Sequence, residues 1–346
     1  MIMKRLVVIF SAIFMLAGCA GDRIPDFYKD PAYRDSMLVA NNVAQYSARR
    51  KISFFKDFKH LFTDSEEGKK KAEEKQLRLY RNGLKKISDE DLKFLKYLYG
   101  EYAELAVVAD YAYLDSEVIL PEGWSDMSEN NERVDSIVSE HLGYGYFASG
   151  LKCSLLTKDD RQVIAFAGTD FPLDWGDVRQ IVHFIKDAYE DYDGAMNDDA
   201  SQPALAKELI DSLIGAGLLD VRKLEFTGHS LGGRLASEMA VHYGCPATIF
   251  NAAGVSPGLY EKYEKLRAEH PSGWRGYIVS IYSANDQLTI FQKYLTEYYD
   301  DEVERDYCAL GAYLKLNESM SGHSIKPLAG YLSKRSDMCA EELESR

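Results

Sequence analysis

The sequence of 346 residues lacks an excess of positive charge, internal repeats and low-complexity segments. Its formal net charge is −14, whereas neutralising nucleic-acid phosphates requires a basic face, so the composition argues against a general nucleic-acid binder. The five cysteines contain no Cys-x-x-Cys pair, and their spacing indicates no metal site. The length suits one large α/β domain, or two small ones, with a substantial core.

The first 20 residues differ from the rest of the chain. A short positive start, Met-Ile-Met-Lys-Arg, precedes an apolar run from Leu6 to Ala17 that only Ser11 interrupts. This run is too short to span a bilayer comfortably, but it suits the core of a signal peptide. It ends in Leu-Ala-Gly-Cys, and a cysteine directly after small residues is typical of a bacterial lipoprotein signal. Residues 1–18 are therefore predicted to be a signal peptide, and Cys19 the acylated first residue.

An acylated Cys19 would anchor the protein to a membrane, because two or more acyl chains hold stably where one does not. In the lipoproteins that this signal resembles, Ala20 in place of Asp favours export to the outer membrane of the bacterial cell envelope. The alternative is an ordinary secretory signal with an incidental cysteine. Among the other cysteines, Cys308 and Cys339 could form one bridge, and simple burial is equally consistent with Cys153 and Cys245.

Residues 19–90 are predicted to form a tether and a helical extension. One face of a short amphipathic helix carries four apolar side chains, with basic residues opposite: Phe54, Phe58, Leu61 and Phe62. This helix either docks on the main domain or lies on an anionic membrane. The charged stretch 64–76 has no apolar face and is expected to be a solvated linker or helix surface.

Residues 91–346 are predicted to form the main domain, opened by a helix with Ser88 as its N-cap. The segments 144–157 and 162–166 are predicted to form a β-hairpin. Further predicted elements are a helix at 202–214, a strand at 224–227, a helix at 231–243, strands at 247–250 and 277–282, and a helix at 325–332. Helices that alternate with short apolar strands predict an α/β fold with a mostly parallel central sheet and helices on both faces.

Residues 226–233, Phe-Thr-Gly-His-Ser-Leu-Gly-Gly, place Ser230 between an apolar strand and a helix. This is the context of a nucleophile held on a sharp turn at the positive end of a helix dipole. Gly228 and Gly232 are expected there because a side chain at either position would clash with neighbouring backbone. His229 is expected to point elsewhere because the turn is so sharp.

A serine nucleophile needs a base and an acid. His323 lies in a loop after all the predicted strands, where this fold presents its base, and Asp286 is the first carboxylate after the strand at 277–282. The chain order Ser230, Asp286, His323 is that of α/β-hydrolases. The alternatives are a helix cap or turn residue for Asp286 and a surface histidine for His323.

An anionic transition state also needs hydrogen-bond donors. The backbone N–H of Leu231, directly after Ser230, is one expected donor. Thr169 follows the strand at 162–166 and can offer its N–H and its hydroxyl. The alternative for Thr169 is an ordinary Gly-Thr turn.

These motifs together resemble the class 3 lipases over residues 90–335. The resemblance rests on Val-Ile-Ala-Phe-Ala-Gly-Thr-Asp, Asp-Trp-Gly-Asp-Val, Gly-His-Ser-Leu-Gly-Gly, Asn-Asp and Gly-His. It implies an α/β-hydrolase fold and carboxylic-ester hydrolysis through an acyl-enzyme, without metal or cofactor. It also implies a triad of Ser230, Asp286 and His323, Thr169 as an oxyanion donor, and a lid at about residues 174–185.

The sequence departs from this family at two places. Ala167 stands where many members have Arg before the Gly-Thr pair, and residues 192–195 replace the family's His-x-Gly-Phe-like segment, which puts the lid's length in doubt. The predicted function is a membrane-anchored serine hydrolase of lipid acyl esters, a lipase or phospholipase A. The alternatives are an esterase or thioesterase for soluble acyl esters, and a non-catalytic surface lipoprotein that retains the fold. The oligomeric state stays open.

Overall fold

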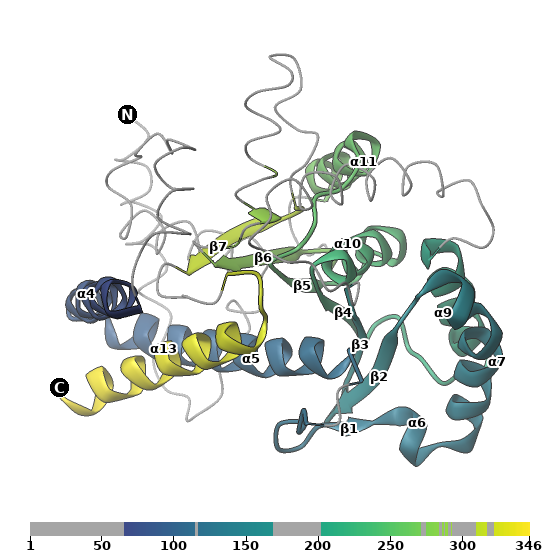
Figure 1. The fold of residues 1–346 in the computed structure, drawn as a ribbon, viewed down its shortest axis with the longest axis horizontal. Coiled ribbons are helices and arrows are strands. Elements are labelled where there is room, and N and C mark those ends of the chain that lie inside the picture. Colours follow the sequence, from purple (N-terminus) through teal and green to yellow (C-terminus); the bar gives the residue numbers. More distant parts are fainter. Residues whose placement is uncertain are drawn as a thin grey trace.

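The computed structural model describes residues 66–114, 117–168, 202–270, 275–283, 309–316 and 322–346, together with Asp286, Leu288, Thr289 and Gln292 (Figure 1). Several sequence predictions lie outside the described residues: the signal peptide with Cys19, the amphipathic helix at 54–62, Thr169, the lid at 174–185, and Cys308. No described helix is long and apolar enough to cross a membrane.

The described strands form one seven-stranded sheet in chain order, β1 to β7. β2 pairs antiparallel with both β1 and β3, and the pairs from β3 to β7 are all parallel. The strands are β1 Ser125–Asp126, β2 Cys153–Lys158, β3 Arg161–Phe166, β4 Leu224–His229, β5 Ala247–Phe250, β6 Ile278–Ser283 and β7 Ala312–Leu316. The prediction of an α/β fold with a mostly parallel sheet is confirmed, and the carboxyl ends of five neighbouring strands share one edge.

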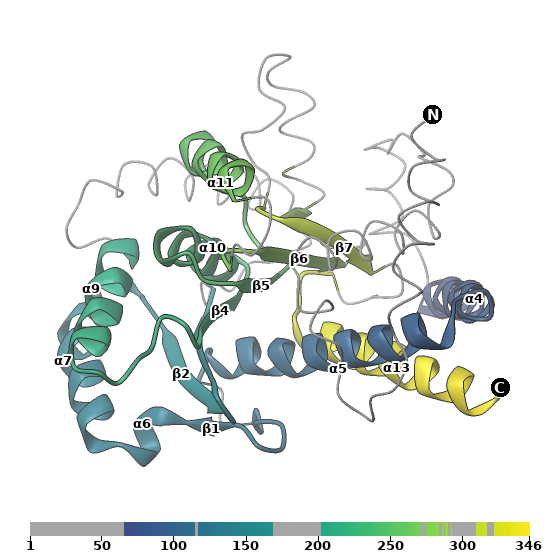
Figure 2. The same cartoon turned by 180° about the vertical axis from the view of Figure 1, so that it is seen from behind.

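Helices cover both faces of the sheet (Figures 1 and 2). One face carries α4 Glu66–Leu84, α5 Asp89–Tyr111 and α13 Lys326–Glu344. The other carries α7 Glu132–Ser149, α9 Gln202–Gly215, α10 Leu231–Tyr243 and α11 Pro257–Glu269, while the short α6 Met127–Asn130 follows β1. Successive side chains of a strand point to opposite faces, so both faces must be apolar where both are covered.

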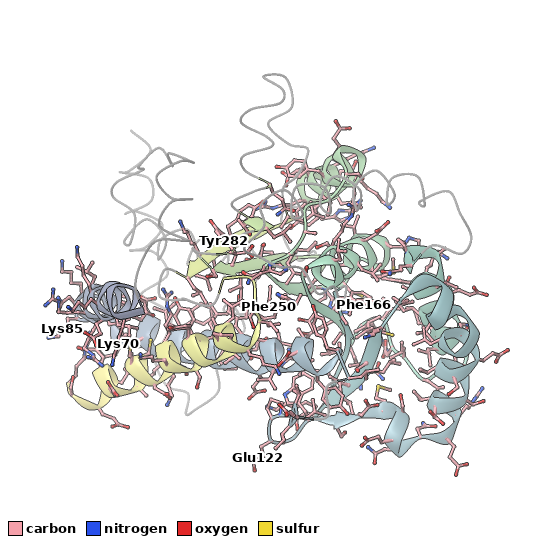
Figure 3. All side chains as sticks on the ribbon, in the orientation of Figure 1. Lys70, Lys85, Glu122, Phe166, Phe250 and Tyr282 are labelled. Carbon is pink, nitrogen blue, oxygen red and sulfur yellow. The ribbon has the colours of Figure 1, made fainter. Side chains whose placement is uncertain are left out.

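β3 shows this alternation clearly. Val163 and Ala165 join the core under α5 and α13, whereas Ile164 and Phe166 join the core under α9 and α10. Figure 3 labels one residue from each core, Phe250 and Phe166, and both lie inside the molecule. The sheet therefore separates two apolar layers, and its carboxyl edge is left for polar side chains.

α5 and α13 pack against each other in antiparallel directions. Ser88 caps α5 as predicted, because its Oγ accepts a hydrogen bond from the Asp91 N–H at 3.1 Å. Near the start of α5, Arg346 at the end of α13 binds Asp89. Further along, Ser336 donates to the carbonyl of Lys96 at 2.8 Å. The end of α5 and the start of α13 are thus brought to the same end of the helix pair.

Three elements differ from the sequence predictions. Residues 144–149 belong to α7 and not to a strand, and β2 begins only at Cys153. Aromatic residues favour strands only weakly, and here the helix that begins at Glu132 continues until Gly150, whose φ of +67° ends it. The structure adds β7, which the sequence analysis missed, and α13 continues well past residue 332.

The described cysteines are free thiols. Cys153, Cys245 and Cys339 are all buried, as the apolar surroundings of the first two indicated. Cys339 is a free thiol against the hydroxyl of Tyr80, and Cys308, the partner that the spacing allowed, lies outside the described residues. Burial raises the pKa of Cys153 to about 12 and the pKa of Cys339 to about 11. Such thiols are protonated and unreactive at neutral pH.

Candidate active site

Ser230 occupies a strained turn between β4 and α10. Its φ is +58° and its ψ is −128°, a backbone conformation that residues other than glycine rarely adopt. The turn is held from β5, because the Ser230 N–H donates to the carbonyl of Phe250 at 3.1 Å. The carbonyl of Ser230 accepts from the N–H of Ala253 at 3.0 Å. The backbone therefore fixes Ser230 directly beyond the carboxyl end of a central strand.

The glycines around Ser230 allow the main chains to approach closely. A Cβ on Gly228 would lie 2.4 Å from the carbonyl oxygen of Gly232, and a Cβ on Gly232 would lie 2.1 Å from that of Phe166. Real Cβ atoms are never found at such distances from backbone oxygens. The prediction that side chains would clash at these two positions is confirmed.

The structure brings Ser230, Asp286 and His323 together from three separate loops. His323 Nε2 lies 2.8 Å from Ser230 Oγ, and His323 Nδ1 lies 2.6 Å from Asp286 Oδ1. The three residues follow β4, β6 and β7, whose carboxyl ends lie on the same edge of the sheet. His323 is 8% exposed and Asp286 is fully buried, so the contact between them is shielded from water.

Asp286 is held by hydrogen bonds on its second oxygen. Oδ2 accepts from the N–H of Thr289 at 2.8 Å and also from the Thr289 hydroxyl. Asp286 therefore caps its own short turn, as one alternative proposed, and at the same time presents Oδ1 to His323. A carboxylate only accepts, so Nδ1 of His323 donates to it. Nε2 is then the acceptor for the proton of Ser230.

The main chain of His323 is also fixed. Its carbonyl oxygen accepts from His229 Nε2 at 2.7 Å and from Asn251 Nδ2 at 3.1 Å. Asn251 in turn accepts from the N–H of Ser283 at 2.9 Å, which connects β5, β6 and the His323 loop. Both ring nitrogens of His229 have partners other than Ser230, because Nδ1 contacts the Tyr113 hydroxyl and Nε2 contacts the loop that carries His323. Sequence reasoning missed Asn251, whose only signal is its position directly after the β5 strand.

The surroundings of the expected oxyanion donors are partly described. Leu231 is the first residue of α10, and N–H groups in the first turn of a helix have no acceptor within the helix. Thr169 lies outside the described residues. The residue before it, Gly168, passes so close to Ser230 that a Cβ on it would lie 2.9 Å from Ser230 Cβ. The main chain that leads to Thr169 is therefore at the serine.

In the part of the chain that the structure describes, no group of three or more metal-binding side chains is close enough to hold an ion. The arrangement at Ser230 allows proton transfer from the serine hydroxyl to an oriented imidazole. A serine, a histidine and a carboxylate hydrogen-bonded in this order occur in serine hydrolases, in peptidases as well as in esterases.

Comparison with known families agrees with this class. Residues 104–316 match the model of the Phospholipase-like family, described as the Tle-like phospholipase domain. The match covers more than half of the 346 residues, so the chain belongs to this family. The matched range includes Ser230 and Asp286 and ends before His323.

A curated relative and a solved structure also match parts of the chain. The extracellular phospholipase A1 of Serratia liquefaciens is 35% identical over 109 residues, which are 31% of this chain and 29% of the relative. The chain thus spans less than a third of that relative's length. A solved structure titled m3DLH shares 18% identity over 53% of this chain and 73% of its own, and its TM-score of 0.29 is too low to indicate a shared fold. None of these matches names the class 3 lipases.

Proposed function

We propose that the protein is a membrane-anchored serine hydrolase that cleaves the carboxylic esters of phospholipids, as a phospholipase A. The observation that carries this proposal is the chain of hydrogen bonds from Ser230 through His323 to Asp286 on a strained turn. The family match and the phospholipase A1 relative support phospholipids as the substrate. The class 3 lipase motifs support the same ester chemistry and an α/β-hydrolase fold.

The reaction proceeds in two halves. His323 Nε2 takes the proton of Ser230 while Oγ attacks the ester carbonyl, and the protonated ring then gives this proton to the leaving alcohol. Water hydrolyses the resulting acyl-serine, with His323 again as the base, and releases the fatty acid. Asp286 keeps His323 in the tautomer with a proton on Nδ1, and it stabilises the imidazolium that forms in each half.

The tetrahedral intermediates carry a negative charge on the former carbonyl oxygen. In this proposal the N–H of Leu231 and the N–H and hydroxyl of Thr169 donate to that oxygen. The helix dipole of α10, which begins at Leu231, adds a favourable field at the same place. By the resemblance to the class 3 lipases, the segment at 174–185 would serve as a lid.

The anchor completes the proposal. Acylation of Cys19 after removal of residues 1–18 would hold the enzyme at the membrane of the bacterial cell envelope, next to its substrate. Cys19→Ser should move the protein from the membrane fraction to the soluble fraction and should abolish incorporation of labelled palmitate. A Cys19→Ser protein that stays in the membrane fraction and takes up label as before would contradict the anchor.

The activity is tested by comparing the wild-type protein with Ser230→Ala on phospholipid vesicles, triglyceride emulsion and short soluble esters. We expect fatty-acid release from phospholipid by the wild type, and a loss of at least about a thousandfold in Ser230→Ala. Equal activity in the two proteins would exclude the mechanism. Activity on short soluble esters alone would identify the protein as an esterase for soluble substrates. If no ester is hydrolysed and a fluorophosphonate probe does not label Ser230, the protein is a binding protein.

A further inference from the structure

Tyr113 is a half-buried tyrosine at the active site for which the triad gives no role. It follows the end of α5 by two residues, and its hydroxyl lies 2.7 Å from His229 Nδ1. On the other side of the same ring, His229 Nε2 lies 2.7 Å from the carbonyl oxygen of His323. One imidazole thus joins Tyr113 to the main chain of His323.

The direction of each hydrogen bond follows from the chemistry of the groups. The carbonyl of His323 can only accept, so His229 carries its proton on Nε2. Burial lowers the pKa of His229 well below its usual value, and the nearby ring of His323 lowers it further, so the ring is neutral at pH 7. Nδ1 is then an acceptor, and the hydroxyl of Tyr113 donates to it.

The Tyr113 hydroxyl also lies against the main chain of Gly168. A Cβ on Gly168 would lie 2.6 Å from the hydroxyl oxygen, so the tyrosine packs directly on this main chain. Burial raises the pKa of Tyr113, and the main chain of Gly168 acts in the opposite direction.

The complete set of contacts therefore runs from the main chain of Gly168 to Tyr113, and by hydrogen bonds from Tyr113 to His229 and from His229 to the carbonyl of His323. Its first end is the residue before Thr169, the proposed oxyanion donor, and its second end is the residue that serves as the base. We propose that Tyr113 and His229 are positioning residues that hold the oxyanion loop and the base at a fixed distance across Ser230. This proposal rests on the proposed function.

The helix pair makes such a connection effective. Tyr113 follows the end of α5, and His323 precedes the start of α13, and these two helices pack side by side. The contacts from Gly168 through Tyr113 and His229 to His323 form a relay. This relay joins the segment after α5 to the segment before α13 a second time, next to Ser230. Displacement of a reacting group by about 1 Å can cost about a hundredfold in rate, so the relay should affect the chemical step more than binding.

Tyr113→Phe removes only the hydroxyl and is the first test. We expect kcat to fall by about tenfold or more while KM stays within about twofold. The matched control is Tyr111→Phe, because Tyr111 is half-buried on the same helix end and its hydroxyl faces Asp126, not the triad. The control should keep both constants within about twofold of the wild type.

His229 provides a second test that does not depend on Tyr113. In His229→Gln the amide nitrogen can replace Nε2 as the donor to the His323 carbonyl, whereas His229→Leu leaves that carbonyl without this donor. We expect kcat of the Gln variant to exceed that of the Leu variant by about tenfold at equal thermal stability. In the His229→Leu background, Tyr113→Phe should cost less than it does alone, because the two act through one chain.

The relay is overturned if Tyr113→Phe behaves like Tyr111→Phe, or if the whole loss lies in KM. It is equally overturned if His229→Gln and His229→Leu have the same kcat. This second comparison tests the relay even if Tyr113→Phe does not fold. Ser230→Ala, assayed alongside, separates these outcomes from a failure of the proposed function. Full activity in Ser230→Ala would remove the mechanism itself, whereas an inactive Ser230→Ala beside a Tyr113→Phe variant with the kcat of the wild type would remove only the relay.

Discussion

The turn at Ser230 and the α5–α13 helix pair are held together in opposite ways. Around Ser230 the strands and helix α10 approach so closely that Gly228 and Gly232 leave no room for a Cβ. Between α5 and α13 large side chains fill the space, and the guanidinium of Arg335 lies 4.5 Å from the ring centre of Tyr80 and 5.4 Å from that of Tyr99. The site thus depends on main-chain contacts, and the helix pair depends on side-chain burial.

This difference has a functional consequence. The main-chain contacts determine where Ser230 and the base stand, so a small displacement there should change the rate. The helix pair supplies stability and carries Tyr113 and His323 at the same end, so it should influence the site only as a whole. Substitutions that separate stability from activity are therefore the way to examine this comparison.

The largest effect is expected from a single added methyl group. Gly232→Ala places a Cβ 2.1 Å from the carbonyl oxygen of Phe166, and we expect a loss of about 3 kcal/mol or more in the free energy of unfolding. The matched control is Gly100→Ala in α5, whose Cβ would meet nothing closer than Ser336 Oγ at 3.5 Å. There the helix propensity of Ala should add up to about 1 kcal/mol. Urea unfolding measures both, and equal stability of the two variants would contradict the contrast.

The next effect concerns the helix pair. Arg335 is fully buried and donates to the hydroxyl of Tyr99 at 3.1 Å. Arg335→Ala removes this contact and leaves a cavity, which should cost about 3 kcal/mol in the free energy of unfolding. Its exposed neighbour provides the control, because Lys334→Ala should change stability by less than about 0.5 kcal/mol. kcat per folded molecule should stay within about twofold, and a tenfold loss would show that the pair acts on the site directly.

The smallest effect is a pH dependence at His229. Its pKa is lowered in the folded state by burial, so below about pH 6.5 the unfolded chain binds a proton that the folded chain does not. The contribution of His229 is therefore nil above that pH, and stability falls with decreasing pH by up to about 1.4 kcal/mol per unit. This loss of stability stops once the pH falls below the pKa of His229 in the folded protein. His229→Gln should flatten the dependence of the unfolding free energy between about pH 7 and pH 5. An unchanged slope in this variant would contradict a neutral, buried His229.

The sequence predicted which three side chains meet better than it predicted the contacts that hold them in place. Ser230 and Asp286 follow apolar strands that the sequence predicted, so their meeting at one edge could be inferred from strand–loop boundaries. His323 was placed by its loop after all the predicted strands, although β7, the strand before it, was missed. Tyr113 and Asn251 could not be inferred this way, because their roles arise from contacts between distant segments and from no local pattern. The residues at 144–149 were wrongly predicted to be a strand for a related reason. Aromatic residues favour strands only weakly, and helix α7 continues through this segment.

The pairing of cysteines shows the same limit. Sequence spacing allowed a bridge between Cys308 and Cys339, but Cys339 lies in the core next to Tyr80 as a free thiol. Cys339 is buried among α4, α5 and α13, and this burial cannot be predicted from the spacing of cysteines in the sequence.

The central claim is that Ser230 is a nucleophile activated by His323. Labelling of the full-length protein with a fluorophosphonate, followed by peptide mass spectrometry, tests it most directly, because the reagent forms a stable adduct only with an activated serine. The account predicts a single adduct on the peptide that contains Ser230, and its loss in both Ser230→Ala and His323→Ala. An adduct at another serine, or full labelling of Ser230 in His323→Ala, would contradict it.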